Sequence, residues 1–232
     1  MDAGYFAAAA AQGETLQTAD GYALAAEALL SEVMLGKARK NKKQSKRARK
    51  LANAALALDP MHQNARLQYA IAEGFITRET GDVSAWMKKL PQKTEVIVQA
   101  YRRDFPNDPR GDALLGAWHL AIARKAGNDN AQKWFGASIT EGRALYEAAL
   151  ARSPDDPVIV VNYAFALMAL DPKDRPDPAI AQGWLRRAAA QNPNDVLNAK
   201  ICEYARVALA QFKDTKAVAT FAGTFLDGKQ PG

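Results

Sequence analysis

The sequence predicts an all-α protein made of stacked helical hairpins. Three observations favour this fold class: clusters of β-branched residues are nearly absent, apolar residues recur every three or four positions, and four helical segments end in similar proline-containing stops. The chain has 232 residues, of which 48% are apolar. This is enough for one large domain or an elongated repeat array.

The helix ends are marked by "ALDP" at Pro60, "DFP" at Pro106, "RSP" at Pro154 and "QNP" at Pro193. Proline cannot continue a helix, and it biases the preceding residue away from helical angles. The stops follow one another at spacings of about 46, 48 and 39 residues, which indicates an internal repeat. The two β-branched stretches, "TEVIVQAY" and "PVIVVNYAF", continue into alanine-rich helical spacing, so we predict helices there as well.

The residues before these prolines resemble the second helix of the tetratricopeptide repeat family. Counted back from the proline, that family has alanine at five residues, a large or aromatic residue at eight and a small residue at twelve. The matching residues are Ala149, Tyr146 and Gly142; Ala188, Leu185 and Ala181; and Ala55, Ala52 and Ala48, where the large residue is missing. Before Pro106 the pattern is displaced by one residue, with Ala100 and Tyr101 near the expected places.

The first helices of the hairpins agree in part with the family's leucine–glycine pair, which lets two helices approach closely. The residues at that place are Tyr69-Ala70, Leu115-Gly116 and Tyr163-Ala164. The segment "LLGAWHLAIARKAG…KWFGASITEGRALYEAAL" is also similar to a group of bacterial repeat proteins, distantly similar to the regulator-of-microtubule-dynamics family. That similarity carries no catalytic residues to this chain.

The resemblance covers about residues 45–195 and implies a solenoid of about four hairpins in a right-handed superhelix. The connections inside three hairpins are longer than the family's repeat of about 34 residues requires. These are "TRETGDVSAWMKKLPQK", "KAGNDNAQKWFGAS" and "DPKDRPDP". We expect a partly ordered N-terminal segment at 1–18, a repeat domain at 19–212, and a C-terminal capping helix with a tail at 213–232.

Catalytic and metal-binding patterns are weak, so we predict no enzyme, no cofactor and no metal. His62 and His119 stand far apart with no second ligand at helical spacing, and the single cysteine, Cys202, makes no zinc site or disulfide framework. No glycine-rich phosphate loop or nucleophile elbow is present. A small-molecule site or an enzyme around Trp118, His119 and Trp134 remains a distant alternative.

The resemblance implies that the first helices line a concave groove. The residues in that register are Asn64, Leu67, Ile71, Arg110, Ala113, Ala117, Leu120, Val158, Val161, Phe165 and Met168. They are mostly apolar, and they lack the lysine and asparagine clamp of the chaperone-docking members. We therefore expect a protein-binding scaffold whose groove takes an apolar or amphipathic segment of another protein. The amphipathic stretch from Asp214 to Gly228 either caps the array or fills this groove.

The sharpest local feature is the basic run "KARKNKKQSKRARK" from Lys37 to Lys50, in which nine of fourteen residues are cationic and none is acidic. The cations assigned to a patch are Arg39, Lys42, Lys43, Lys46, Arg47 and Lys50. One interpretation is a solvated helix start. The other is an adaptor to an anionic surface, either phospholipid or nucleic acid. The absence of aromatic residues from the run weakens single-stranded nucleic acid binding.

Trp86 and Trp134 lie in the lengthened connections, where they either fold back on the array or contact a partner. The partner's identity and the oligomeric state stay open. No apolar run approaches the roughly 20 residues of a transmembrane helix. The N-terminus has no lysine or arginine before its alanine-rich run, so an intact secretory signal is not expected. The sequence as it stands suggests the cytoplasm, or the periplasm if a leader was removed.

Overall fold

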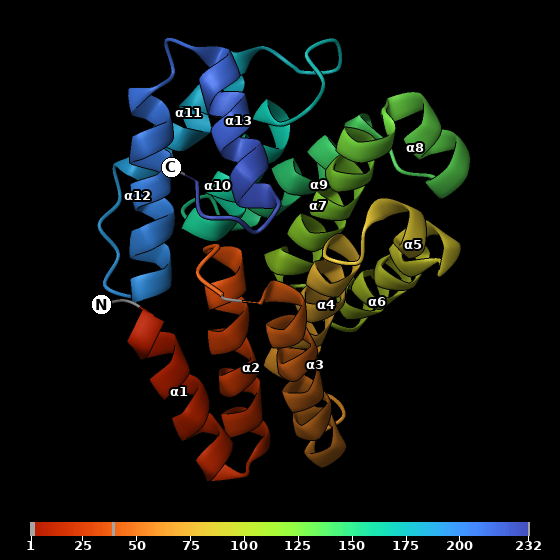
Figure 1. Cartoon of the computed structure of the whole chain (residues 1–232), viewed down its shortest axis with the longest axis vertical. Coiled ribbons are helices and arrows are strands. Elements are labelled where there is room, and N and C mark those ends of the chain that lie inside the picture. Colours follow the sequence, from red (N-terminus) through yellow and green to blue (C-terminus); the bar gives the residue numbers. More distant parts are fainter. Residues whose placement is uncertain (1–2, 39, 232) are drawn as a thin grey trace. The chain divides into compact units, whose positions relative to one another are not determined.

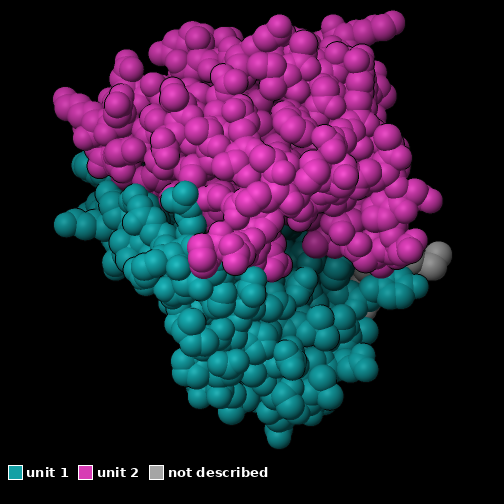
Figure 2. Space-filling model, turned by 180° about the vertical axis from the view of Figure 1, so that it is seen from behind, with its two compact units in different colours: residues 1–105 teal, residues 106–232 magenta. Residues whose placement is uncertain are grey.

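The computed structural model describes residues 3–38 and 40–231, and this part of the chain contains helices and loops but no strand (Figure 1). The all-α prediction is confirmed. Both β-branched stretches lie in helices, in α6 (Leu90–Asp104) and α10 (Pro157–Met168). The helices group into two compact units, residues 1–105 and 106–232 (Figure 2), whereas the sequence suggested one continuous repeat domain at 19–212.

Unit 1 holds the first six helices, and successive long helices pack side by side. They are α1 (Ala3–Leu16), α2 (Ala19–Met34), α3 (Asn41–Leu58), α4 (Gln63–Arg78), α5 (Asp82–Met87) and α6. In addition, α2 packs against α4. The predicted N-terminal segment contains α1, which joins α2 through Gln17 and Thr18. The two helices touch at Gly13 and Gly21, where an added Cβ would lie 2.5 Å from the other glycine's carbonyl oxygen.

Unit 2 holds the remaining helices. They are α7 (Pro109–Ala126), α8 (Asn128–Phe135), α9 (Ile139–Arg152), α10, α11 (Pro178–Ala189), α12 (Val196–Ala210) and α13 (Thr215–Leu226). Here α7 pairs with α9, and α10 pairs with α11. The helices α7 and α12 both pack on α10. The expected C-terminal helix is α13, which also packs on α10 and whose first turn is capped by the carboxylate of Asp214.

The helices that end before the four prolines bury the same three positions. In α3, α9 and α11 the residues five, eight and twelve before the proline are all buried, as the pattern predicts. In α6 the buried residues are Thr94, Val98 and Tyr101, at the same three distances before Pro106. The displacement by one residue predicted there is therefore wrong. The register holds, while threonine and tyrosine replace the small residues.

Two of the three lengthened connections contain a short helix. Helix α5 follows Gly81 and α8 follows Gly127, and both glycines have a positive φ, 80° and 76°, which residues with a side chain rarely adopt. The third connection, residues 171–177, contains no helix. The segment around Gly127 is thus the joint of the α7–α9 hairpin.

Candidate functional site

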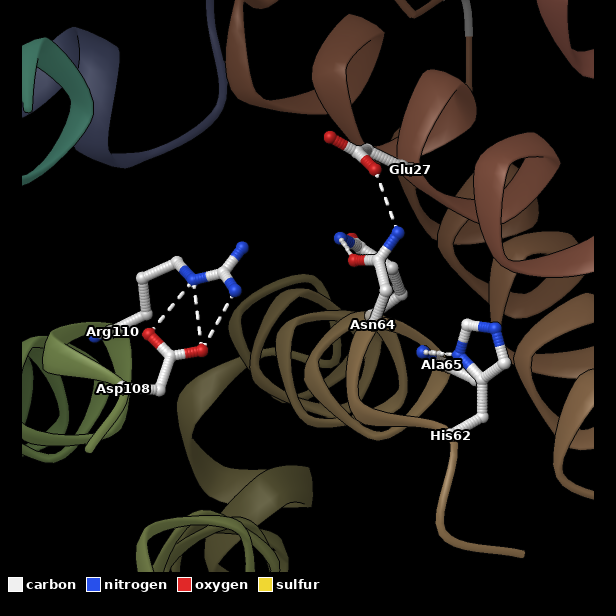
Figure 3. A network of polar contacts seen from close by, with 7 residues as sticks. Glu27, His62, Asn64, Ala65, Asp108 and Arg110 are labelled. Carbon is white, nitrogen blue, oxygen red and sulfur yellow. Dashed lines mark hydrogen bonds and ion pairs between the residues drawn. The ribbon is translucent and has the colours of Figure 1, made fainter. Parts of the chain in front are cut away.

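In unit 1 the predicted groove residues lie on α4. The side-chain amide of Asn64 donates a hydrogen bond to Glu27 on α2 (2.9 Å) and accepts one from Gln68 (2.9 Å), as Figure 3 shows. Leu67 is buried and Ile71 is half-buried. Asn64 is therefore already engaged within the unit, and Ile71 is the apolar member of this set that solvent still reaches.

In unit 2 the groove set begins at the first turn of α7. Arg110 is exposed, and its guanidinium binds the carboxylate of Asp108 at 2.7 Å (Figure 3). Asp108 also caps α7 by accepting the backbone N–H of Arg110 (2.9 Å). Further along the helix Ala113 and Leu120 are buried, and Ala117 is half-buried. The carboxylate of Asp108 thus holds the guanidinium of Arg110 at the start of α7.

The apolar face of α10 is not open. Val161, Phe165 and Met168 have no exposed surface, while Val158 is half-buried. The ring of Phe165 meets two rings of α13 edge to face, Phe221 at 5.7 Å and Phe225 at 5.2 Å between centroids. Of the two roles predicted for the C-terminal helix, this packing matches the one in which the helix covers groove residues. Three of the four predicted groove residues on α10 are therefore buried within unit 2.

The contact between α13 and the rest of unit 2 is also ionic. The guanidinium of Arg124 on α7 binds the carboxylate of Asp227 at 2.5 Å, just after α13 ends. Tyr204 on α12 adds a third aromatic ring against Phe221 and Phe225. An amphipathic helix therefore lies on α10 through two phenylalanines one turn apart and is tied to α7 by one acidic residue.

The part of the basic run from residue 41 onward forms the first half of α3, and Lys37 and Lys40 precede the helix. Lys43, Lys46, Arg47 and Lys50 are exposed and opposite the buried side of the helix. Lys42 is half-buried, and Arg39 lies outside the described residues. Arg47 is paired with Glu14 on α1, and Arg49 with Glu73 on α4 at 3.0 Å. The part of the chain that the structure describes contains no carboxylate paired with Lys43, Lys46 or Lys50.

His119 is buried beside Trp118, and the two rings meet edge to face at 5.0 Å. Its Nδ1 accepts the backbone N–H of Ser138 (3.1 Å), which ties α7 to the start of α9. Burial lowers the pKa of His119, and nearby Glu141 opposes this shift. Trp134 is exposed on α8. The three residues of the distant alternative thus comprise a structural histidine, a buried indole and a surface indole.

The other candidate ligands are also engaged in structure. His62 Nδ1 accepts the N–H of Ala65 at the start of α4 (Figure 3), and Nε2 binds the carboxylate of Asp20 (2.9 Å). Cys202 is buried, which raises the pKa of its thiol. Among the residues described, no three histidine, cysteine or carboxylate side chains are grouped to hold a metal ion. A shallow polar hollow lined by residues 126–130, Lys173 and Asp174 contains two carboxylates, Asp129 and Asp174, but no histidine or cysteine.

Helix α5 presents an exposed apolar group beside lysines. On α5 three apolar side chains are more than half exposed, Val83 at 73%, Trp86 at 57% and Met87 at 75%. Lys88 and Lys89 follow directly and Lys93 lies one turn later, and all three are exposed. The sequence offered a partner contact as one of two roles for Trp86, but it did not join Trp86 to Val83 and to the three lysines. The signal for that combination is "VSAWMKKLPQK", where apolar residues stand beside lysines.

Comparison with protein-family models, with curated proteins and with solved structures finds no significant match for this chain. Within the described residues, no helix combines the length and the apolar character needed to cross a membrane.

Proposed function

We propose that this chain is a helical-hairpin repeat protein of the tetratricopeptide type that acts as a non-enzymatic scaffold for an amphipathic segment of another protein. The shared burial five, eight and twelve residues before each proline supports the repeat. The packing of α2 on α4, and of α7 and α12 on α10, supports a common inner layer of first helices within each unit. Such a layer is the usual binding surface of solenoid repeats.

The observation that carries the proposal is the packing of α13 on α10. We call this contact the α13 seat; it consists of Phe165, Phe221 and Phe225 and the ion pair of Arg124 with Asp227. Phe221 and Phe225 are spaced by one helical turn and rest on Phe165, and Asp227 pairs with Arg124. A partner helix with two aromatic residues at i and i+4 and a carboxylate two residues later would make the same contacts. Such a partner binds by displacing α13, because the aromatic seat holds one helix.

The test uses the full chain and a labelled peptide of residues 214–229. In the wild type the tethered α13 has a high effective concentration and competes with the peptide. A variant with Phe221→Ala and Phe225→Ala weakens the tethered helix and is expected to bind the peptide roughly tenfold more tightly than the wild type. The same peptide with both phenylalanines replaced by alanine should not bind.

Circular dichroism must show that the variant is folded. Asp227→Ala in the chain serves as a milder second variant, because it loosens only the ionic contact of the tethered helix and keeps Arg124 for the carboxylate of the peptide. Failure of every folded variant to bind the unmodified peptide would contradict the proposal. If the loosened variant does bind the peptide, affinity capture with it from cell extract is expected to retain a protein that the free peptide displaces.

A second candidate function is an adaptor to an anionic surface through the basic run. The observation in its favour is the exposed stripe of Lys43, Lys46 and Lys50 on α3. Salt separates the two candidates, since a contact made by exposed charges collapses at about 0.5 M salt whereas an aromatic seat persists. Replacing Lys43, Lys46 and Lys50 by glutamine should abolish binding only in the adaptor case.

A further inference from the structure

We propose that one end of unit 1, which we call the α5 end, docks on the surface of an anionic phospholipid bilayer. The α5 end consists of the apolar residues Val83, Trp86 and Met87 and the lysines Lys40, Lys42, Lys43, Lys88, Lys89 and Lys93. This site is separate from the α13 seat, and it differs from the basic run in its lipid-inserting side chains and in half of its cations.

The fold brings these residues to one end because α3 and α4 run antiparallel. Asn41, the first residue of α3, donates a side-chain hydrogen bond to Glu79, the residue after α4 (3.4 Å). Helix α5 follows within three residues of Glu79, and α6 starts three residues after α5. The start of α3, the end of α4, all of α5 and the start of α6 therefore share one end of the unit, as the ribbon shows (Figure 1).

The charge at this end is positive, because the six lysines outnumber the carboxylates of Glu79 and Asp82. Within the described residues none of the six lysines is paired with a carboxylate. Glu79 is taken by Arg78 at 3.1 Å, so it does not neutralise them. Elsewhere in unit 1 carboxylates and guanidinium groups are paired, Glu14 with Arg47 and Asp104 with both Arg66 and Arg103. The lysines of the α5 end, unpaired within the described residues, differ from these pairs.

The α5 end also exposes apolar side chains next to these lysines. Val83, Trp86 and Met87 belong to a helix of six residues in which only Ala85 is buried. Exposure of a tryptophan, a methionine and a valine side by side on a short helix is unfavourable in water. Such grouped apolar surface is typical of an interaction site. Tryptophan is the residue that prefers the headgroup level of a bilayer, and aliphatic side chains enter the acyl boundary below it.

The chemistry of the occupant follows from this combination. Each lysine near an anionic leaflet adds electrostatic attraction, and the three apolar side chains add insertion. A nucleic acid would satisfy the lysines and stack on Trp86, but it offers nothing comparable to Val83 and Met87. A bilayer with anionic headgroups binds the lysines electrostatically and takes up the apolar side chains, so a membrane surface is the occupant that fits the α5 end.

The experiment is flotation of the full chain with vesicles of phosphatidylcholine alone and of phosphatidylcholine mixed with phosphatidylglycerol. We expect binding to the anionic vesicles only. Trp86→Ala with Met87→Ala should lower the partition coefficient roughly tenfold or more. Lys88→Gln, Lys89→Gln and Lys93→Gln together should lower it roughly 100-fold. The blue shift of tryptophan emission on anionic vesicles should disappear in the Trp86 variant.

Matched controls come from unit 2 and from α3. Trp134→Ala removes a comparably exposed indole (54%), and Lys213→Gln with Lys216→Gln and Lys229→Gln removes the same charge; both should bind as the wild type does. No binding to anionic vesicles would overturn the inference. So would binding that depends on Lys46, Arg47 and Lys50 but not on Trp86, which would instead support the basic-run adaptor. Trp86-dependent binding of single-stranded RNA without vesicle binding would also overturn it. None of these outcomes bears on the α13 seat.

Discussion

The hairpins α4–α6 and α7–α9 have the same plan and are held together in different ways. Each joins two long helices through a connection that contains a short helix. In α7–α9 the helices touch through glycines, since a Cβ on Gly116 would lie 2.8 Å from the carbonyl oxygen of Gly142. In α4–α6 Thr94 stands where α9 has Gly142. The closest atom that a Cβ on Gly74 would meet is a Thr94 methyl at 4.0 Å.

The wider hairpin relies on side chains. The hydroxyl groups of Thr77 and Thr94 share a hydrogen bond of 2.9 Å, and Arg66 pairs with Asp104 near the other end. Tyr101 is fully buried at the position where α9 has Ala149. The comparison teaches that helices with the same buried spacing accommodate either a backbone contact or a large side chain between them. The two hairpins should therefore respond oppositely to glycine-to-alanine substitution.

The largest expected effect comes from removing the spacer. Tyr101→Ala leaves a cavity in the α4–α6 hairpin and should reduce the free energy of unfolding of unit 1 by about 3–5 kcal/mol. Tyr101→Phe keeps the ring and should cost far less. Urea unfolding followed by circular dichroism measures both. A Tyr101→Ala variant as stable as Tyr101→Phe would mean that the hairpin does not depend on the volume of this ring.

The glycines provide a test with opposite signs. Gly116→Ala places a methyl group 2.8 Å from a backbone oxygen and 2.9 Å from the ring of Tyr146. Overpacking of this kind should destabilise the protein by about 1–3 kcal/mol. Gly74→Ala meets no close atom inside α4 and should stabilise it by about 0.5–1 kcal/mol through helix propensity. Thermal or urea unfolding reports both, and two changes of the same sign would remove the distinction between the hairpins.

The sequence predicted the close hairpin better than the wide one. Gly142, Tyr146 and Ala149 match a known residue pattern, and the pattern reflects helix contact directly. In α6 the buried positions hold Thr94 and Tyr101, so residue type concealed a register that only burial shows. The packing of α1 was also missed, because its contact through Gly13 and Gly21 depends on two glycines that stand in unremarkable surroundings.

The candidate sites were predictable to a lesser extent. The basic stripe on α3 follows from helical periodicity alone, and the structure exposes it. The closing of α10 by α13 depends on how a distant helix folds back, which local periodicity leaves open between capping and filling. The α5 end joins residues 40–43 to residues 83–93 through the antiparallel packing of α3 and α4, and no local pattern contains that relation.

The α7–α9 connection is held by a titratable residue, so the stability that this residue contributes should depend on pH. His119 holds the start of α9 through Ser138, and burial lowers its pKa below the ordinary value of about 6.5. The unfolded chain therefore binds a proton at a higher pH than the folded chain. The contribution of His119 to stability is full above pH 6.5 and is lost progressively as pH falls toward its lower folded-state pKa.

His119→Asn retains an oxygen acceptor for the Ser138 N–H and does not titrate. The difference in unfolding free energy between wild type and this variant should therefore change between pH 7.5 and 5.5, with the wild type losing more. Urea unfolding at a series of pH values measures it. A difference that stays constant with pH would show that His119 is not held neutral by the fold.

The smallest expected effect concerns the two exposed indoles. Trp86 lies among Lys88, Lys89 and Lys93, whereas Trp134 on α8 has Lys133 and Asp129 as its charged neighbours. Iodide is attracted to a positive surface, so relative to neutral acrylamide it should quench Trp86 about twofold more efficiently than Trp134. The contribution of each indole is obtained by subtracting the spectra of Trp86→Phe and Trp134→Phe from that of the wild type. The α5 end is defined in part by its positive charge. If the ratio of iodide quenching to acrylamide quenching is the same for Trp86 and Trp134, the two connections do not differ in electrostatic potential, and α5 is an exposed apolar helix like α8.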